Sequence, residues 1–271
     1  MFPGFFMLSR NQLKHIHSLQ QKKFREIHRQ FLAEGSKMVL EILESPYRII
    51  AVYATADWLK RNEYLLISGK VPYTEIREEE MEMITALSSP GPVLAIVEIP
   101  APSALPVPAD DLVLVLDDIK DPGNLGTIIR VADWFGIASV VCSENTVDLY
   151  NPKVIQATMG SVARVGVYYC NLAEFLSSLD PAIKIYGTFP EGENIYAVPL
   201  DPKGVIVIGS ESSGISPELD SKITNRISIP SYAAATGRSH AESLNASTAT
   251  AIVCSEFRRR KRGDLPVQFI L

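Results

Sequence analysis

The sequence predicts an α/β protein in which a small α/β/α sandwich precedes a mostly parallel sheet with helices on both faces. Three observations support this fold class. Apolar runs of strand length alternate with segments of helical periodicity, which is typical of α/β units. The run Leu112–Asp117 is almost wholly apolar, as in a strand buried on both faces of a parallel sheet. Four prolines between Ile99 and Asp111 favour a stiff linker between the two halves.

The length and charge of the chain limit its number of domains and the way in which it could bind RNA. With 271 residues, 46% of them hydrophobic, the chain is long enough for one large or two modest cores. Its 26 basic and 31 acidic residues give a net charge of −5, so any RNA-binding charge must be local. Two basic segments stand out, at Arg10–Arg29 and Arg258–Arg262. The alternative for each is an ordinary solvated helix face or tail.

The spacing of the cysteines and the length of the apolar runs argue against a metal-binding, disulfide-linked or membrane-spanning protein. Cys142, Cys170 and Cys254 are too widely spaced for a zinc site or a disulfide framework, so we expect no metal. The apolar opening of the chain lacks a basic n-region, and no later run reaches the length of a membrane span. We therefore expect a soluble, cytoplasmic protein without a membrane partner.

The expected elements follow from periodicity and from turn residues. Before the linker we expect helices over residues 9–20 (continuing or re-forming to 29), from 35, near 57 and over 78–87, and strands over 30–34, 49–53, 64–67 and 92–99. After it we expect strands near 112–117, 138–142, 164–170, 183–188, 204–209 and 226–229, and helices near 125–135, 152–159, 171–179 and 244–260. The second set is the pattern of a doubly wound sheet.

The first candidate site follows the 112–117 strand, where residues 121–130 read Asp-Pro-Gly-Asn-Leu-Gly-Thr-Ile-Ile-Arg. Pro122 and Gly123 end the strand, and a helix is expected from about Asn124, with that residue as its N-cap. Arg130 lies off the apolar stripe and is expected to point away from the core. Open α/β sheets bind ligands at such turns. The alternative is an ordinary turn with a capping Asn and a solvated Arg.

The second candidate site is the glycine-rich loop after the 204–209 strand. Gly209 and Gly214 allow close approach of backbone N–H groups, and Glu211 is the only charged side chain between them. Ile215 follows Gly214 where a P-loop has Lys. No strand is followed by Gly-x-Gly-x-x-Gly, which disfavours a nicotinamide or flavin enzyme. The alternative is a plain strand-to-helix turn.

The third candidate site joins Ile227-Ser228-Ile229-Pro230 to a later Ser243-Leu244-Asn245. Ser243 is expected to be the N-cap of the last helix. Many small residues follow in that helix, which favours close packing on another backbone or on a second subunit.

Together these stretches resemble the three motifs of the SpoU family of RNA ribose 2'-O-methyltransferases, in the same order and each at the end of an expected strand. Matching residues are Asp121, Pro122, Asn124, Leu125, Gly126 and Arg130, then Gly209, Glu211 and Gly214, then Ile229, Pro230, Ser243, Leu244, Asn245 and Ser247. Phe31–Gly35, with Lys37, resembles the start of the ribosomal-protein-like domain that precedes the catalytic domain in many members.

The resemblance implies a deep trefoil knot, S-adenosylmethionine as cofactor, and a homodimer formed through the knotted domain. It implies cofactor contacts from Thr188, Gly209, Glu211, Gly214, Ile229 and Leu244, and catalytic roles for Asn124, Arg130, Glu211, Ser243 and Asn245. The expected domains are an RNA-binding domain over 1–100, a linker over 101–110 and a methyltransferase domain over 111–271. The added first domain favours ribosomal RNA over transfer RNA as substrate.

One segment departs from the family pattern. The loop over residues 231–242 is longer than the corresponding loop of the family. Because this loop belongs to the cofactor pocket in the family, its length puts the affinity for the cofactor in question. Arg238 and His240 within it are either substrate contacts or solvated loop residues. Alternatives to a ribosomal RNA enzyme are a transfer RNA methyltransferase and an RNA-binding protein of the same fold without activity. A third is a nucleotide-dependent oxidoreductase, although the chain lacks the phosphate-binding fingerprint of such enzymes.

Overall fold

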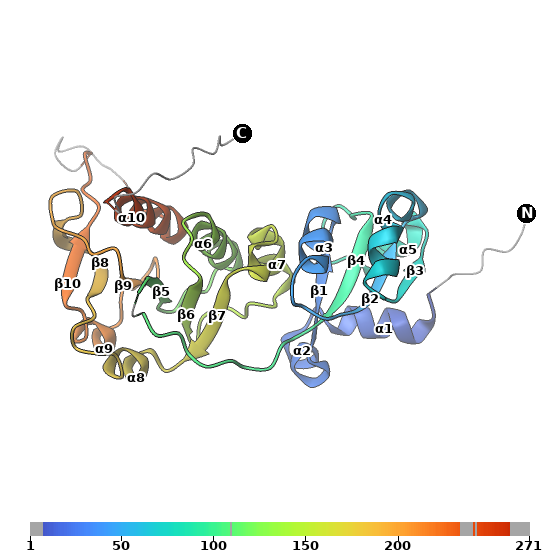
Figure 1. The fold of residues 1–271 in the computed structure, drawn as a ribbon, viewed down its shortest axis with the longest axis horizontal. Helices are drawn as coiled ribbons and strands as arrows, with labels where there is room; N and C mark the ends of the chain where they lie inside the picture. The colour runs from blue at the N-terminus through green and yellow to red at the C-terminus, as the bar shows by residue number, and fades with distance from the viewer. Residues whose placement is uncertain (1–7, 109, 234–240, 242, 261–271) are drawn as a thin grey trace, which may run out of the picture. The chain divides into compact units, whose positions relative to one another are not determined.

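The computed structural model describes residues 8–108, 110–233, 241 and 243–260, and its strands form two sheets (Figure 1). The first sheet has the strand order β1-β4-β2-β3, and the second has the order β10-β8-β9-β5-β6-β7. The chain falls into two compact units. The first unit comprises residues 1–104, 120–130 and 147–167, and the second comprises 105–119, 131–146 and 168–271.

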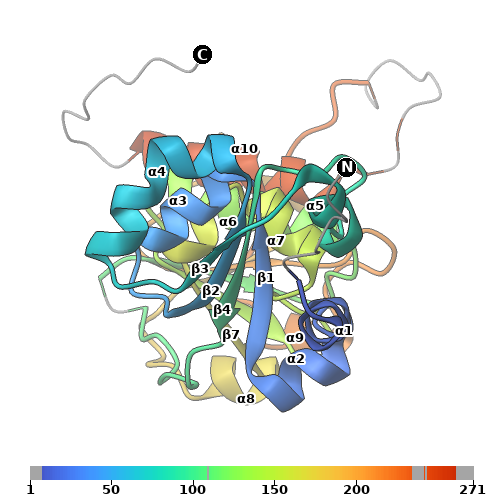
Figure 2. The ribbon, with the colours of Figure 1, turned by 90° about the vertical axis from the view of Figure 1, so that its right-hand side faces the viewer.

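The first unit begins with an α/β/α sandwich. Its elements are α1 (Arg10–Ser18), α2 (Lys22–His28), β1 (Gln30–Glu34), α3 (Ser36–Leu43), β2 (Ile49–Ala54), α4 (Ala56–Ser68), β3 (Tyr73–Glu75), α5 (Glu78–Ile84) and β4 (Val93–Glu98). Helices α3 and α4 cover one face of the sheet, and α1 and α5 cover the other (Figure 2). Ile16, Met81 and Ile84 from α1 and α5 share a buried cluster with Leu32 and Leu94. The predicted sandwich is confirmed.

One predicted strand of this half is wrong. Residues 64–67 form the second half of helix α4. Its Tyr-Leu-Leu-Ile sequence resembles a buried strand locally, yet only Leu66 of the four is buried, whereas Tyr64 and Ile67 are 67% and 61% exposed. Leu66 is buried together with Leu59 and Trp58, seven and eight positions earlier, which is helical spacing. The true strand, β3, is only three residues long and was missed.

The second sheet confirms all six predicted strands. They are β5 (Leu112–Leu116), β6 (Ser139–Ser143), β7 (Gly166–Cys170), β8 (Ile185–Asn194), β9 (Gly204–Ile208) and β10 (Asn225–Ser228). The pairs β10–β8, β8–β9, β9–β5 and β5–β6 are all parallel. Every residue of β5 and β9 is buried, as expected for central strands of a parallel sheet.

Helices of the second unit cover both faces of its sheet (Figure 1). Helices α8 (Leu172–Ser177) and α9 (Pro217–Asp220) pack on Val113, Val205 and Val207 through Phe175 and Leu219. The last helix, α10 (Ala246–Arg260), lies on the opposite face. There the ring of Phe257 meets that of Tyr186 edge-on, with 4.9 Å between centroids. Helix α6 (Pro122–Trp134) has residues in both units, whereas α7 (Pro152–Thr158) and a 3-10 turn, η1 (Ser161–Ala163), belong to the first.

The pairing of β8 with β10 contains a large irregularity. Arg226 pairs with Gly187, but the next residue, Ile227, pairs with Glu193. Residues 188–192 therefore leave the ladder at the carboxyl end of the sheet. A Cβ atom on Gly192 would lie 2.4 Å from the backbone carbonyl carbon of Ile227, so a glycine is required where the chain passes this close to β10.

Candidate active site

The first motif begins helix α6, although not at the predicted residue. The helix starts at Pro122, and the Asp121 carboxylate accepts the backbone N–H of Asn124 at 2.8 Å. Asp121 therefore caps the helix, and the prediction of Asn124 as N-cap is wrong. Proline is favoured at the first helical position because its missing N–H would have no partner there. Asn124 is buried, with 8% exposure, and Arg130 is exposed as predicted.

The second motif forms a tight loop that requires its glycines. Ser210 and Gly214 form a bridge, with N–H···O distances of 3.0 and 2.9 Å in the two directions. A Cβ atom on Gly209 would lie 2.1 Å from the carbonyl carbon of Gly214, so no larger residue fits without displacing backbone. Gly214 has φ +67°, in the region that glycine adopts most readily. The loop thus presents backbone at the carboxyl end of β9.

Glu211 joins the second motif to the third. Its Oε1 accepts a hydrogen bond from the side-chain Nδ2 of Asn245 at 2.8 Å and another from the backbone N–H of Ala246 at 2.9 Å. A carboxylate at this position also interacts favourably with the positive end of the α10 dipole. The structure therefore brings two of the predicted catalytic residues together.

Asn245 is the N-cap of α10. Its Oδ1 accepts the backbone N–H groups of Ser247 at 3.0 Å and Thr248 at 3.2 Å. The prediction of Ser243 as N-cap is wrong, since Ser243 lies two residues earlier and is exposed. Asn and Ser are similarly strong caps, so the sequence offered two candidates, and the hydrogen bond to Glu211 favours the later one.

The other predicted cofactor residues lie near the carboxyl ends of neighbouring parallel strands. Thr188 is in β8 at the point where the chain leaves the ladder, and its hydroxyl donates to the Val207 carbonyl at 3.3 Å. Ile229 directly follows β10 and is half-buried. Leu244 precedes α10 and is 46% exposed, unusual for a leucine in a well-packed region. With Gly209 and Gly214, these residues come from one edge of the second unit's sheet.

A cavity of about 350 Å³ opens at the same edge, beside β5 and β6. Its lining includes Gly214 of the predicted site, together with Asp117, Asp118 and Glu144, which sequence analysis did not single out. The Asp117 carboxylate accepts the backbone N–H of Ser216 at 2.7 Å. Asp118 has φ +61° and donates its backbone N–H to the Ser143 hydroxyl at 2.9 Å. The position of Asp117 and Asp118 directly after a buried strand was the available sequence signal.

The basic residues of α10 are mostly engaged within the protein. The Arg258 guanidinium donates to the carbonyls of Phe135 and Gly136 at 2.7 and 3.0 Å and pairs with Asp111 at 2.8 Å. Arg260 binds Glu256 and the carbonyl of Ile195. These two arginines hold the end of α10 in place, so they are neither a solvated tail nor available for RNA. Residues 261 and 262 of the predicted basic run lie outside the described residues, as do Arg238 and His240.

The described part of the chain holds neither a metal-type cluster of side chains nor a membrane-spanning helix. No three or more His, Cys, Asp and Glu side chains gather there as a metal ion would require. None of the helices in this part of the chain has the length and apolar character needed to cross a membrane.

Comparison with known proteins agrees with the three motifs. The SpoU rRNA Methylase family matches residues 111–255, and the MRM3-like substrate binding domain matches residues 10–95. The 23S rRNA (guanosine(2553)-2'-O)-methyltransferase RlmP of Bacillus subtilis is 29% identical over 242 residues, covering 89% of this chain and 93% of that protein.

Two solved structures extend this similarity over nearly the whole chain. A TrmH-family protein from Porphyromonas gingivalis is 37% identical, with a TM-score of 0.83, covering 94% of this chain and 100% of that one. An AdoMet-bound rRNA methyltransferase from Sinorhizobium meliloti is 28% identical, also with a TM-score of 0.83, covering 96% and 98%. The ordered motifs, the parallel sheet that carries them and these matches lead to one conclusion: the chain belongs to the SpoU rRNA Methylase family.

Proposed function

We propose that this protein transfers a methyl group from S-adenosylmethionine to the 2'-hydroxyl of one ribose in ribosomal RNA. The observation that carries the proposal is the joining of the second and third motifs by Glu211 and Asn245 at the carboxyl edge of a parallel sheet. The names of the relatives support the reaction and the substrate, since the Bacillus subtilis protein is a 23S rRNA 2'-O-methyltransferase and the Sinorhizobium meliloti structure contains AdoMet.

The residues at this edge fit S-adenosylmethionine. Among the described residues, none lies within 4 Å of the position that a Cβ atom on Gly214 would take, so the loop is open to a ligand on that side. Leu244 offers exposed apolar surface for an adenine ring, and Thr188 and Ile229 extend the same edge. Glu211 shapes the site by holding the start of α10. When bound, the cofactor supplies the activated methyl group.

The catalytic residues would act on the RNA. The ribose hydroxyl must lose its proton as it attacks, and arginine is a poor base because its guanidinium stays protonated in proteins. We assign to Arg130 the binding of an RNA phosphate and stabilisation of the developing alkoxide, which a planar guanidinium does well. Asn124, Ser243 and Asn245 would orient the ribose, and Glu211 would fix Asn245 for that role.

The wider organisation belongs to the same proposal. We divide the chain into an RNA-binding domain over 1–100, a linker over 101–110 and a methyltransferase domain over 111–271. The matched ranges 10–95 and 111–255 support this division. Four prolines and the lack of helix or strand over residues 99–108 support the linker. We further propose a trefoil knot in the second domain, a homodimer formed through it, and a cytoplasmic location, where ribosomal RNA is available.

Methyl transfer to separate RNA pools tests the proposal. Purified protein is incubated with labelled S-adenosylmethionine and with unmodified ribosomal RNA or unmodified transfer RNA. We expect label in ribosomal RNA alone. Label in transfer RNA alone would replace the proposed substrate. RNA binding without label in either pool would favour a binding protein that has lost its activity.

A further inference from the structure

The sheet β1-β4-β2-β3, which we call the substrate-binding sheet because the proposed function assigns it to RNA, packs with helix α7 within the first unit through an aromatic cluster. Phe31 on β1 is fully buried, and its ring lies 4.8 Å from that of Tyr150 and 5.7 Å from that of Tyr47, measured between centroids. Burial raises the pKa of both phenols, so both stay neutral at physiological pH. Tyr150 lies just before α7, so this helix is anchored on the sheet.

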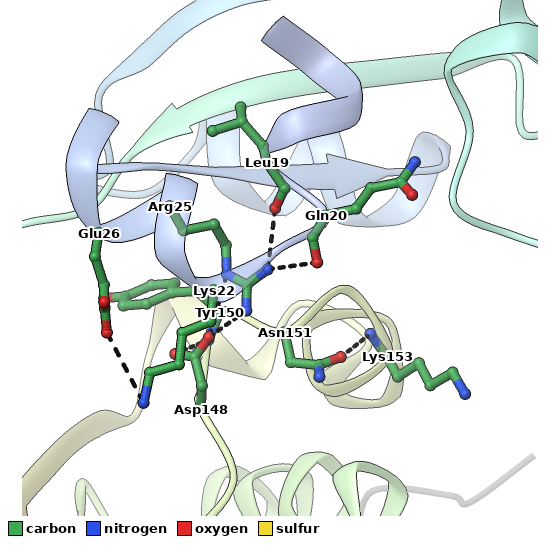
Figure 3. Close-up of polar contacts among 9 residues, drawn as sticks. All are labelled: Leu19, Gln20, Lys22, Arg25, Glu26, Asp148, Tyr150, Asn151 and Lys153. Atoms are coloured by element: carbon green, nitrogen blue, oxygen red, sulfur yellow. Dashed lines mark hydrogen bonds and ion pairs between the residues drawn. The ribbon is translucent and has the colours of Figure 1, made fainter. Parts of the chain in front are cut away.

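An ion pair between the buried Arg25 and the partly exposed Asp148 connects the same two parts (Figure 3). Arg25 on α2 is only 2% exposed, and its Nε and Nη2 donate to Oδ2 of Asp148 at 3.1 and 2.5 Å. Its Nη1 donates to the carbonyls of Leu19 and Gln20 at 3.0 and 2.8 Å. The other Asp148 oxygen accepts the backbone N–H of Tyr150 at 3.1 Å.

This geometry removes Arg25 from RNA contact, although it lies in the basic segment singled out from the sequence. The neighbouring pair between Lys22 and Glu26 is different, since its atoms are 3.8 Å apart and both side chains are mostly exposed (Figure 3). A surface pair of that kind contributes little to structure. In the Arg25–Asp148 pair the guanidinium is buried, so breaking the pair leaves an uncompensated charge on Arg25, and the pair therefore favours one geometry.

Helix α7 in turn contacts the helix that carries the first motif. A Cβ atom on Gly126 of α6 would lie 2.4 Å from the Ala157 Cβ and 2.7 Å from the Val154 carbonyl oxygen, so the two helices meet at close range. Gly126 lies between Asn124 and Arg130 on α6. A second link comes from Glu41 on α3, which pairs with Arg164 beyond α7 and lies against Gly160.

We infer that Arg25 and Asp148 are positioning residues, which fix the substrate-binding sheet relative to Asn124 and Arg130 through α7. The inference rests on the proposed function, because it assigns the sheet to RNA and the two α6 residues to the ribose. The distance between the RNA held by the sheet and the two α6 residues is then fixed. Loosening the link leaves RNA affinity nearly unchanged and lowers turnover, since a misplacement of about 1 Å can cost as much as a hundredfold in rate.

The test compares two carboxylate-to-amide substitutions of the same shape. Asp148→Asn removes the charge that pairs with the buried Arg25 but keeps the oxygen that accepts the Tyr150 N–H. Asp57→Asn is the control, because Asp57 pairs with Lys60 at 3.0 Å on the exposed surface of the same sandwich. Methylation of unmodified 23S ribosomal RNA should show kcat reduced about tenfold in Asp148→Asn, with KM for RNA and Kd for S-adenosylmethionine within about twofold of wild type. The control should match wild type, and Asp148→Glu, which keeps the charge on a longer side chain, should recover only part of kcat.

A second readout does not depend on RNA. Spin labels are placed on cysteines introduced at Glu82 and Lys153, two exposed positions on α5 and α7, in protein carrying Cys170→Ser. The distance distribution should be narrow in wild type and in Asp57→Asn, and broader in Asp148→Asn. If Asp148→Asn does not fold, Asp148→Glu is measured in its place, and a shifted mean distance is expected because its side chain is longer.

The outcomes distinguish failure of the positioning role of Arg25 and Asp148 from failure of the proposed methyltransferase function. An unchanged distance distribution together with unchanged kcat in Asp148→Asn would overturn the inference. A raised KM at unchanged kcat would also overturn it, since that result indicates a role in RNA affinity. If the wild-type protein methylates no RNA, the proposed function fails, and the label distances alone decide whether the ion pair fixes the sheet.

Discussion

Glu211 and Asn245 lie 34 positions apart in the chain and are joined by a hydrogen bond of 2.8 Å from amide to carboxylate. The same carboxylate oxygen accepts the first backbone N–H of α10, and the Asn245 oxygen accepts the next two. The glycine-rich loop after β9 and the start of α10 therefore form one hydrogen-bonded assembly. Both side chains are oriented by the protein itself, so little ordering is left for a ligand to supply.

The identity of the α10 cap gives a first prediction. Asn245→Ala should lower the free energy of unfolding by about 1–2 kcal/mol, because it removes the cap and a partner of Glu211. Ser243→Ala should change it by less than about 0.5 kcal/mol, as expected for an exposed residue outside the helix. Urea denaturation of the two variants measures the difference. Equal losses would contradict the assignment of Asn245 as the cap.

Arg130 separates cofactor binding from methyl transfer. Arg130→Ala should lower kcat at least about a hundredfold, because it removes the group assigned to the developing alkoxide. The Kd for S-adenosylmethionine, measured by calorimetry, should stay within about twofold of wild type. Arg130→Lys keeps the charge without the planar fork and should recover only part of the rate. Weak cofactor binding with normal turnover would show that the role assigned to Arg130 is wrong.

The close contact at Gly126 gives a stability prediction. Gly126→Ala should destabilise the protein by about 1–3 kcal/mol, because the added methyl overlaps Ala157 and the Val154 carbonyl. This cost exceeds the gain of about 1 kcal/mol that Ala normally brings to a helix. Gly123→Ala is the control, since its Cβ would meet a single side-chain oxygen, Oδ1 of Asp121, at 3.0 Å. Thermal unfolding should place Gly126→Ala well below the control, and the reverse order would contradict the packing.

Glu256 gives a pH dependence. Hydrogen bonds from Arg259, at 2.8 Å, and from Arg260 lower the pKa of this carboxyl below its ordinary value of 4.5, against the opposing effect of burial. A carboxyl whose pKa is lower in the folded state stabilises the protein fully at pH values above its unfolded-state pKa. This stabilisation is lost as the pH falls through its folded-state pKa. Between about pH 6 and pH 3.5, the Tm of wild type should therefore fall more than that of Glu256→Gln. Parallel Tm curves for the two proteins would exclude this contribution.

The sequence predicted most of the second sheet because its strands are unambiguous. Val113 and its neighbours in β5 are apolar on both faces, and only a buried parallel strand accommodates such a run. Helix α4 was mispredicted in part because Tyr64 and Ile67 are apolar but exposed, and single-sequence patterns carry no measure of burial. Strand β3 was missed because three residues show no periodicity.

The sequence predicted which residues form the site, but not which residues they contact. Asp121 and Asn245 replaced Asn124 and Ser243 as caps, since neighbouring polar residues are equivalent until the helix start is known. Arg25 appeared to belong to a basic surface, whereas Asp148, distant in sequence, draws it into the interior. No local pattern predicts a partner 123 positions away.

The position of the transferred methyl group tests the central claim most directly. Ribosomal RNA labelled by this protein is digested to nucleosides, which are separated and identified by mass spectrometry. We predict label in a single 2'-O-methylnucleoside, at a position whose phosphodiester linkage resists alkaline cleavage. Label in a base-methylated nucleoside would contradict the assignment of Asn124, Arg130, Glu211 and Asn245 to a ribose hydroxyl.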